Sequence, residues 1–311
     1  MTKHIFIDGS AGTTGLQIRE RLAERADLAL ITLDQSDKKD PAKRAEAMAD
    51  ADISILCLPD AAARESVSFA RANSTRIIDT STAHRIAPGW VYGLPEYLPE
   101  QADLIRAAHR VANPGCYPTG VVLCLHPLVR AGLLPPDYPV SVAAVSGYTG
   151  GGKQMIEQYE DKGSEAYAPS PFQVYGLQLQ HKHLAEMKVY GGLTKPPVFV
   201  PSVANFPQGM ITQVGLDLAH LTGSPTIEGL HQLLAKYYEN TPHVTVVPLN
   251  EARQVTRLHG DMLAGSDDLR IYVFGSEEKG QVLLAAVFDN LGKGASGAAV
   301  QNLDLMLEGG N

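Results

Sequence analysis

The sequence predicts an α/β protein in which a doubly wound parallel sheet is combined with a second domain of the α+β type. Two observations carry this prediction. Short apolar runs of strand length alternate with helical stretches through the first third of the chain, and a turn of spacing G-x-x-G-x-x-G joins the first run to the first helical stretch. A length of 311 residues exceeds that of a typical single domain, so we expect two domains.

Composition excludes several classes of function. Hydrophobic residues make up 44% of the chain, yet no apolar run approaches the roughly 20 residues that a membrane span needs. The N-terminus lacks the pattern of a signal peptide, so we expect a soluble protein in the cytoplasm, without membrane contact. A formal charge of −8 argues against general nucleic-acid binding, although it is compatible with a local cationic pocket for a phosphorylated small molecule.

The glycine-rich turn follows the first predicted strand, residues 4–8, and precedes a helical pattern. Small residues at this spacing let the backbone approach a pyrophosphate, and the new helix offers its N-terminal amides. A tight turn that binds nothing is the alternative interpretation. The residues that we expect at a dinucleotide cofactor are Gly9, Ser10, Gly12, Thr13, Thr14 and Gly15.

Further strands are predicted at residues 28–33, 53–58 and 76–79, with a helical stretch at 60–73. Asp34 stands at the end of the second strand, where an acid favours NAD by binding the ribose hydroxyls. Ser36, Lys38 and Lys39 follow and would instead hold the 2′-phosphate of NADP. Position alone leaves the cofactor open, and a solvated loop is equally compatible with the lysines.

Cys116 is the candidate nucleophile. It follows a predicted strand at 110–112 and precedes an apolar helix at 121–129, so it lies at a helix start, where backbone dipoles favour a thiolate. A thiolate is the form that attacks a carbonyl. Cys57 and Cys124 lie inside apolar runs and are interpreted as small buried side chains.

Three segments together resemble one enzyme family: residues 9–15, 113–120 and 289–297. The chain is similar to the N-acetyl-γ-glutamyl-phosphate reductases of arginine biosynthesis, relatives of the aspartate-semialdehyde dehydrogenases. Residues 146–153 and the short chain resemble the compact subtype. The resemblance implies NADPH as cofactor, an acyl-phosphate substrate, a thioester on Cys116, and a homodimer or homotetramer.

A His-x-His-x-x-Glu element beside the cysteine of that family matches His181, His183 and Glu186 here. The resemblance favours His181 as the acid and base, with Glu186 orienting an imidazole from its i+3 position. A zinc site and surface histidines without a role are the alternatives. We expect no metal, because no third ligand is evident.

Other residues are assigned to the substrate or the cofactor. Arg85 is the first choice for the leaving phosphate, because loops at sheet ends bind ligands in such folds, and Lys153 is the second. The remaining substrate residues are Asn113, Ser146, Gly147, Tyr175 and His183, and the resemblance places Asn290 near the cofactor.

The predicted Rossmann-like domain comprises residues 1–116 and 290–311, and the catalytic and dimerisation domain comprises 117–289. Strands are expected at 140–145, 211–218, 244–248, 270–274 and 282–288, with helices at 226–238 and up to Leu307. An apolar face on such a sheet would suit dimerisation.

Two other substrates and one other class of function remain open. Aspartyl phosphate is disfavoured because residues 199–210 lack the later histidine that aspartate-semialdehyde dehydrogenases carry there. An acetylated aminoadipyl phosphate is a further alternative substrate. A redox-sensing, nucleotide-binding regulator without turnover is the rival class, and it would be expected to lack the intact His181, His183 and Glu186.

Overall fold

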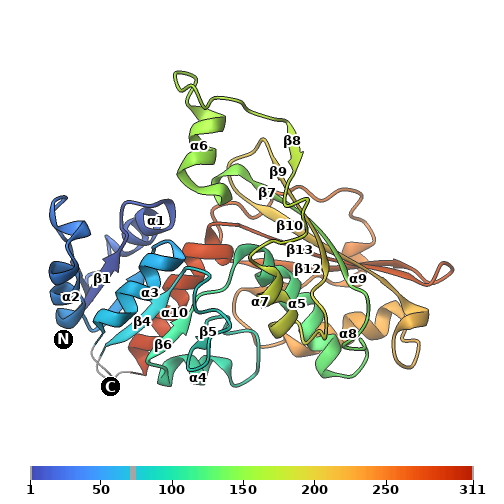
Figure 1. Cartoon of the computed structure of the whole chain (residues 1–311). Coiled ribbons are helices and arrows are strands. Elements are labelled where there is room, and N and C mark those ends of the chain that lie inside the picture. Colours follow the sequence, from blue (N-terminus) through green and yellow to red (C-terminus); the bar gives the residue numbers. More distant parts are fainter. Residues whose placement is uncertain (1, 71–74, 310–311) are drawn as a thin grey trace. The chain divides into compact units, whose positions relative to one another are not determined.

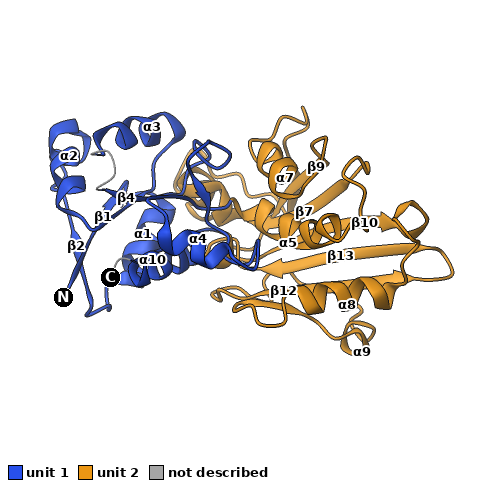
Figure 2. Cartoon of the chain, turned by 90° about the horizontal axis from the view of Figure 1, so that it is seen from below, with its two compact units in different colours: residues 1–114, 295–311 blue, residues 115–294 orange. Residues whose placement is uncertain are grey.

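The structure is a computed structural model that describes residues 2–70 and 75–309. The chain divides into two compact units (Figure 2): unit 1 comprises residues 1–114 and 295–311, and unit 2 comprises residues 115–294. The predicted domain boundaries differ from this division. The structure assigns Gly115, Cys116 and residues 290–294 to unit 2, whereas the sequence assigned them to the nucleotide-binding domain.

Unit 1 contains a parallel sheet whose strand order is β2-β1-β3-β4-β6-β5. Its strands are β1 (Lys3–Asp8), β2 (Leu28–Ile31), β3 (Ile53–Leu56), β4 (Arg76–Asp79), β5 (Val91–Tyr92) and β6 (Arg110–Ala112). Its helices are α1 (Thr13–Leu22), η1 (Asp37–Lys39), α2 (Pro41–Asp50), α3 (Asp60–Phe69), α4 (Gln101–Ala107) and α10 (Gly297–Glu308). The second and third strands end two residues earlier than predicted. Helix α3 ends at Phe69, and residues 71–73 of its predicted range lie outside the described residues.

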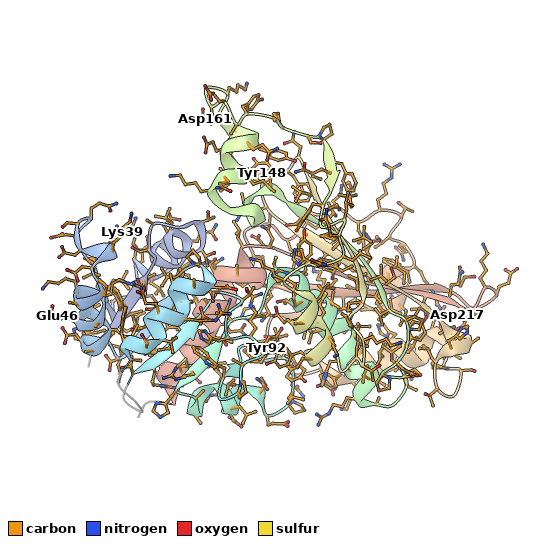
Figure 3. All side chains as sticks on the ribbon, viewed as in Figure 1. Lys39, Glu46, Tyr92, Tyr148, Asp161 and Asp217 are labelled. Atoms are coloured by element: carbon orange, nitrogen blue, oxygen red, sulfur yellow. The ribbon has the colours of Figure 1, made fainter. Side chains whose placement is uncertain are left out.

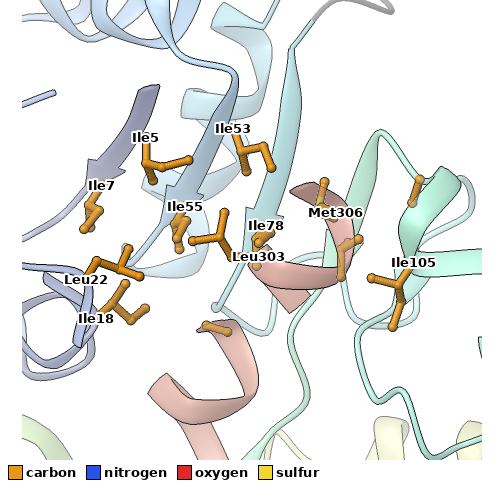
Figure 4. Packing of buried hydrophobic residues seen from close by; sticks show 13 residues of the cluster. Ile5, Ile7, Ile18, Leu22, Ile53, Ile55, Ile78, Ile105, Leu303 and Met306 are labelled. Carbon is orange, nitrogen blue, oxygen red and sulfur yellow. The ribbon is translucent and has the colours of Figure 1, made fainter. Parts of the chain in front are cut away.

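Alternating apolar residues of these strands pack against helices on both faces of the sheet. Ile5 and Ile7 contribute to one core with Ile18 of α1 and Leu303 of α10 (Figure 4), whereas Phe6 contributes to another core that includes Met48 of α2. Helix α10, from the C-terminal end of the chain, lies beside β4 and α4 (Figure 1). The doubly wound α/β prediction is therefore confirmed.

Unit 2 contains a mixed sheet of order β11-β12-β13-β10-β7-β9-β8, in which β7–β9 and β11–β12 pair in parallel and the other neighbours pair antiparallel. Its strands are β7 (Ser141–Gly147), β8 (Phe172–Val174), β9 (Val198–Ala204), β10 (Met210–Asp217), β11 (Val244–Val246), β12 (Leu269–Ser276) and β13 (Gln281–Phe288). Its helices are α5 (Cys116–Arg130), η2 (Tyr148–Gly151), α6 (Gly152–Glu160), α7 (Leu184–Tyr190), η3 (Leu218–His220), α8 (Ile227–Tyr237) and α9 (Leu249–Ala252). The π-helical turn η4 (Gly292–Ser296) begins in unit 2 and includes the first two residues of the C-terminal segment of unit 1. This is the expected α+β arrangement. The elements without a predicted counterpart include β8, β9, α6, α7 and α9.

Helix α5 packs directly on β10 and β13. A Cβ on Gly120 of this helix would lie 2.3 Å from Thr212 Oγ1, so only glycine permits the close approach. The position of α5 on the sheet fixes the place of Cys116, its first residue. Among the described residues no helix is both long and apolar enough to cross a membrane.

Candidate active site

The glycine turn of unit 1 connects β1 to α1 through positions that exclude side chains. Gly9 has φ +89°, and a Cβ there would lie 2.3 Å from the Cys57 carbonyl oxygen. A Cβ on Gly15 would lie 2.5 Å from the Gly9 carbonyl oxygen. Gly12 differs, because its nearest neighbour would be 3.6 Å away, so packing within the protein leaves room there. Helix α1 then begins at Thr13 and Thr14 without a side-chain cap, and its first amides face the turn.

A cavity of about 250 Å³ lies beside this turn. Gly9, Ser10 and Lys38, which were predicted to contact the cofactor, line it together with Arg19 and Lys39 (Lys39 is labelled in Figure 3). Arg19, which no sequence motif indicated, reaches the cavity from α1. A glycine cradle beside three cationic side chains fits a dinucleotide that carries an additional phosphate.

Two predicted cofactor contacts of the loop after β2 have other surroundings. Ser36 donates a hydrogen bond from Oγ to Asp37 Oδ1 over 2.9 Å. Asp34 is exposed, and its backbone carbonyl accepts hydrogen bonds from the amides of Asp37 and Lys38. Among the described residues of the loop after β2, Lys38 and Lys39 line the cavity, whereas Asp34 does not.

Two residues that were predicted to contact the substrate form hydrogen bonds to backbone carbonyl groups of unit 1, namely Arg85 and Asn113. The buried Arg85 guanidinium donates from Nε to the Asn113 carbonyl oxygen over 3.0 Å and from Nη2 to the Thr80 carbonyl oxygen over 3.1 Å. Asn113 donates from Nδ2 to the Ala295 carbonyl oxygen and accepts from Asn302, each over 3.0 Å. Their contact with substrate stays a prediction.

His84, next to Arg85 in the same loop, was not among the predicted site residues. Asp79 is fully buried at the end of β4 and accepts hydrogen bonds from His84 Nδ1 over 2.6 Å and from Ser81 Oγ over 2.8 Å. The His84 ring stacks on Trp90 with centroids 4.3 Å apart. A carboxylate thus fixes the orientation of this imidazole.

In unit 2, Cys116 is the first residue of α5, and Gly115 is the N-cap. The Gly115 amide donates a hydrogen bond to Glu186 Oε1 over 2.8 Å, and Glu186 is only 2% exposed. A Cβ on Gly294 would lie 3.0 Å from Cys116 Cβ, so backbone of the terminal glycine run packs against the cysteine. The helix N-terminus stabilises negative charge on the sulfur.

Aromatic and imidazole rings gather around Tyr117, the residue after the cysteine. The rings of His181 and His183 lie 4.7 Å apart, and each lies 6.0 Å from the Tyr117 ring. Tyr175 donates from its hydroxyl to the Tyr117 hydroxyl over 3.1 Å, and Tyr117 donates to the Ser202 carbonyl oxygen over 3.1 Å. The structure therefore brings together Tyr175, His181 and His183, and it adds Tyr117 itself, which only its place beside Cys116 could have indicated.

Burial sets the protonation of these rings. It lowers the pKa of His181 to about 4, with a smaller contribution from the charge of Lys182. It raises the pKa of Tyr175 to about 12. Burial likewise raises the pKa of Cys57 and of Cys124 to about 12, so both thiols are protonated at neutral pH. Cys124 is buried as predicted, whereas the side chain of Cys57 is only partly buried.

Hydrogen bonds hold the backbone around the end of β7, and they involve Ser146, Gly147 and Asn290. Asn290 is 1% exposed; its Oδ1 accepts the Gly209 amide over 2.7 Å, and its Nδ2 donates to Thr149 Oγ1 over 3.2 Å. Ser146 donates from Oγ to the Gly147 carbonyl oxygen over 3.0 Å. These contacts are structural, and the predicted contacts with ligands remain untested.

Tyr148, labelled in Figure 3, is the first residue after β7. Its ring stacks on that of Tyr159 of α6, with centroids 4.7 Å apart. Lys153, the second choice for binding phosphate, is exposed on the same helix. In the part of the chain that the structure describes, no three His, Cys, Asp or Glu side chains are placed to share a metal ion.

Comparisons with known proteins match both units. Residues 4–105 match the NAD binding domain of semialdehyde dehydrogenases, and residues 116–290 match their dimerisation domain. The N-acetyl-gamma-glutamyl-phosphate reductase of Brucella ovis is 54% identical over 308 residues, 99% of each chain, and that of Brucella melitensis is equally similar. The chain belongs to the N-acetyl-gamma-glutamyl-phosphate reductase family. The family resemblance predicted from three short segments is therefore confirmed over nearly the whole chain.

Solved structures of aspartate-semialdehyde dehydrogenases share the fold of this N-acetyl-gamma-glutamyl-phosphate reductase family member. The enzyme II of Vibrio cholerae matches with a TM-score of 0.72 at 16% identity, over 99% of both chains. The Candida albicans enzyme, solved with NADP, matches with a TM-score of 0.66 at 13% identity. At these identities the similarity concerns fold alone.

Proposed function

We propose that the chain reduces N-acetyl-γ-glutamyl phosphate to N-acetylglutamate 5-semialdehyde and phosphate, with NADPH as the reductant. The relatives from Brucella are named for this reaction. One structural observation carries the proposal. Cys116 is the first residue of α5, and the ring of the next residue, Tyr117, lies near the imidazoles of His181 and His183. Arginine biosynthesis in the cytoplasm is the setting that this reaction implies, and an odd number of three cysteines suits a reducing compartment.

The chemistry proceeds in two stages on the sulfur of Cys116. The thiolate attacks the acyl carbon, a C–S bond forms, and the C–O bond to phosphate breaks, which leaves a thioester. When bound, the reduced nicotinamide supplies a hydride. The carbon that accepts this hydride then releases the sulfur, so that the C–S bond breaks and the aldehyde leaves a regenerated thiolate. Tyr175 and His183, which border the same cluster, are proposed to hold the substrate.

NADPH is proposed over NADH because of the side chains at the cavity beside the glycine turn. Lys38, Lys39 and Arg19 line the cavity and provide positive charge for a 2′-phosphate. Asp34, which would favour NAD, is exposed and is not part of the described lining. Thr13 and Thr14 begin the helix whose amides would face the pyrophosphate.

The reverse reaction tests the proposal. The protein is mixed with N-acetylglutamate semialdehyde, phosphate and NADP, and absorbance of the reduced cofactor is followed. Phosphate-dependent NADPH formation is expected. Faster turnover of aspartate semialdehyde or of the acetylated aminoadipate semialdehyde would reassign the substrate, and no turnover with any aldehyde would favour the regulator.

A homodimer is proposed on a separate observation. One face of the sheet in unit 2 has its core around Ile211 and Val287, but along β9 the same face exposes Val198 and Val200, which are 52% and 39% exposed. Val174 of the neighbouring β8 is 41% exposed. An exposed apolar strip that continues a core fits a second copy of this chain.

Light scattering at micromolar concentration is expected to give at least twice the chain mass of 33.4 kDa. Val200→Asp should reduce the assembly, whereas Lys153→Asp on the exposed side of α6 serves as a matched control. A wild-type monomer would contradict the dimer.

A further inference from the structure

A local hydrogen bond fixes which ring nitrogen of His181 carries the proton. The His183 amide donates to His181 Nδ1 over 3.1 Å, and the Leu184 amide donates to the His181 carbonyl oxygen over 3.1 Å. An N–H group meets Nδ1 only where that nitrogen presents its lone pair. The neutral ring therefore carries its proton on Nε2, and its single lone pair is already used.

The groups around the His181 ring favour its neutral form. His181 is half-buried among Tyr117, Tyr175 and Phe199, whose ring centroids lie between 5.1 and 6.0 Å away. His183 packs on the fourth side, and the charge of Lys182 opposes a second proton. Within the described residues His181 makes no side-chain hydrogen bond besides the one to His183, so its Nε2–H is available to a ligand.

The proposed reaction needs a hydrogen-bond donor at the carbonyl oxygen. When the thiolate attacks, negative charge forms on that oxygen, and it disappears when phosphate leaves. The charge forms again when the thioester accepts hydride, and it disappears when sulfur leaves. Each collapse restores the C=O bond without a proton reaching this oxygen, so a donor that keeps its proton is sufficient.

We propose that His181 acts as a neutral Nε2–H donor to the carbonyl oxygen of the substrate and does not take the thiol proton as a general base. This inference rests on the proposed reductase reaction and replaces the acid and base role that the family resemblance suggested. The proton of Cys116 then leaves to water before substrate binds, which the N-terminus of α5 favours. A neutral histidine that polarises a carbonyl is known chemistry for an imidazole whose pKa is lowered.

Nitrogen NMR of the substrate-free protein tests the tautomer independently of activity. In long-range ¹H–¹⁵N spectra of histidine-labelled protein, the His181 signals are assigned as those lost in His181→Gln. We expect a protonated Nε2 and an unprotonated Nδ1 throughout pH 5.5 to 8. A proton on Nδ1, or conversion to imidazolium around pH 6 to 7, would overturn the proposal even if the enzyme is active.

Kinetics of two variants test the role. Glutamine supplies an N–H donor but cannot accept a proton at neutral pH, whereas alanine supplies neither. Loss of a donor of this kind lowers kcat by roughly 10² to 10³. In the reverse assay we expect His181→Ala to lose about that much and His181→Gln to stay within about tenfold of wild type.

Equal loss in both variants, with an acidic limb of the pH–rate profile that disappears in each, would show a general base and overturn the donor role. Circular dichroism establishes that both variants fold. Wild-type protein that reduces none of the acyl phosphates would refute the proposed function and leave the NMR result to decide the tautomer.

Discussion

Glu186 accepts the backbone amide of Gly115 over 2.8 Å, although the two residues are 71 positions apart. The hydrogen bond ties the first turn of α7 to the residue before Cys116. The resemblance suggested that Glu186 orients an imidazole, which stays a prediction, whereas the structure shows that Glu186 binds the backbone amide next to Cys116. We expect this buried carboxylate to position the cysteine, because a charge-assisted hydrogen bond is shorter and stronger than a neutral one.

Removal of the Glu186 carboxylate should therefore lower kcat more than it raises KM. Glu186→Ala leaves the buried Gly115 amide without its acceptor, and we expect a loss of about 1–3 kcal/mol in the free energy of unfolding together with slower alkylation of Cys116 by iodoacetamide. Glu186→Gln retains an oxygen acceptor and should recover most of the stability. Glu251→Ala, at an exposed position of α9, is the control. Unchanged alkylation in Glu186→Ala would show that the carboxylate does not position the sulfur.

Cys116→Ser should reduce turnover to below about 1% of wild type, because a serine hydroxyl is far less ionised than a thiol. Mass spectrometry gives a second readout. Wild-type protein mixed with N-acetylglutamate semialdehyde and NADP in the absence of phosphate should gain an N-acetylglutamyl adduct on the peptide that contains Cys116. Cys57→Ala should still form the adduct. Activity of several per cent in Cys116→Ser, free of wild-type contamination, would contradict the covalent route.

Two glycines of the cofactor turn should respond differently to alanine. Gly12→Ala has space and an ordinary φ of −78°, so stability should change by less than about 1 kcal/mol. If the backbone approaches a pyrophosphate there, the Kd for NADPH should rise at least tenfold, as measured by fluorescence titration. Gly9→Ala instead brings its methyl group against the Cys57 carbonyl and should lower the melting temperature. Unaltered NADPH binding in Gly12→Ala would remove this turn from the cofactor site.

The lowered pKa of His181 predicts a dependence of stability on pH. Between its ordinary value of 6.5 and the folded value of about 4, the unfolded chain binds a proton that the folded chain excludes. The contribution of His181 to the free energy of unfolding is therefore fully present above pH 6.5, and it decreases as pH falls from 6.5 towards 4. Because the ring is half-exposed, we expect the effect to amount to only about 1 kcal/mol.

Urea unfolding of wild type and His181→Gln at pH 7 and pH 4.5 measures how the contribution of His181 to stability depends on pH. The stability difference between the two proteins should shift by that amount in favour of the variant at acid pH. His126, whose pKa burial also lowers, is present in both proteins and cancels in the comparison. An identical difference at both pH values would show that His181 is not held neutral by the fold.

The pattern of apolar residues and glycines along the chain was sufficient to predict many of the strands and helices. Strand β4 and strand β6 begin and end at the predicted residues, since apolar periodicity and glycine turns report on the local chain. Cys116 lies at a helix start as expected, although α5 begins before the predicted range of 121–129. Strand β8 was not predicted because it is only three residues long and mostly exposed, which leaves no alternation to detect. Lys293 lies in an ordinary-looking turn of the sequence, yet it is 1% exposed in the structure.

The sequence by itself determined the parallel sheet of unit 1 and the family, and it predicted Cys116 as the nucleophile, because each depends on residues that are neighbours along the chain. Only the tertiary structure decided that Glu186 holds Gly115 and that Tyr117 forms the centre of the histidine cluster. It also showed that the lone pair of His181 is used within its own segment. These relationships depend on how α5, α7 and β9 pack and on the direction of single N–H groups, which spacing does not encode.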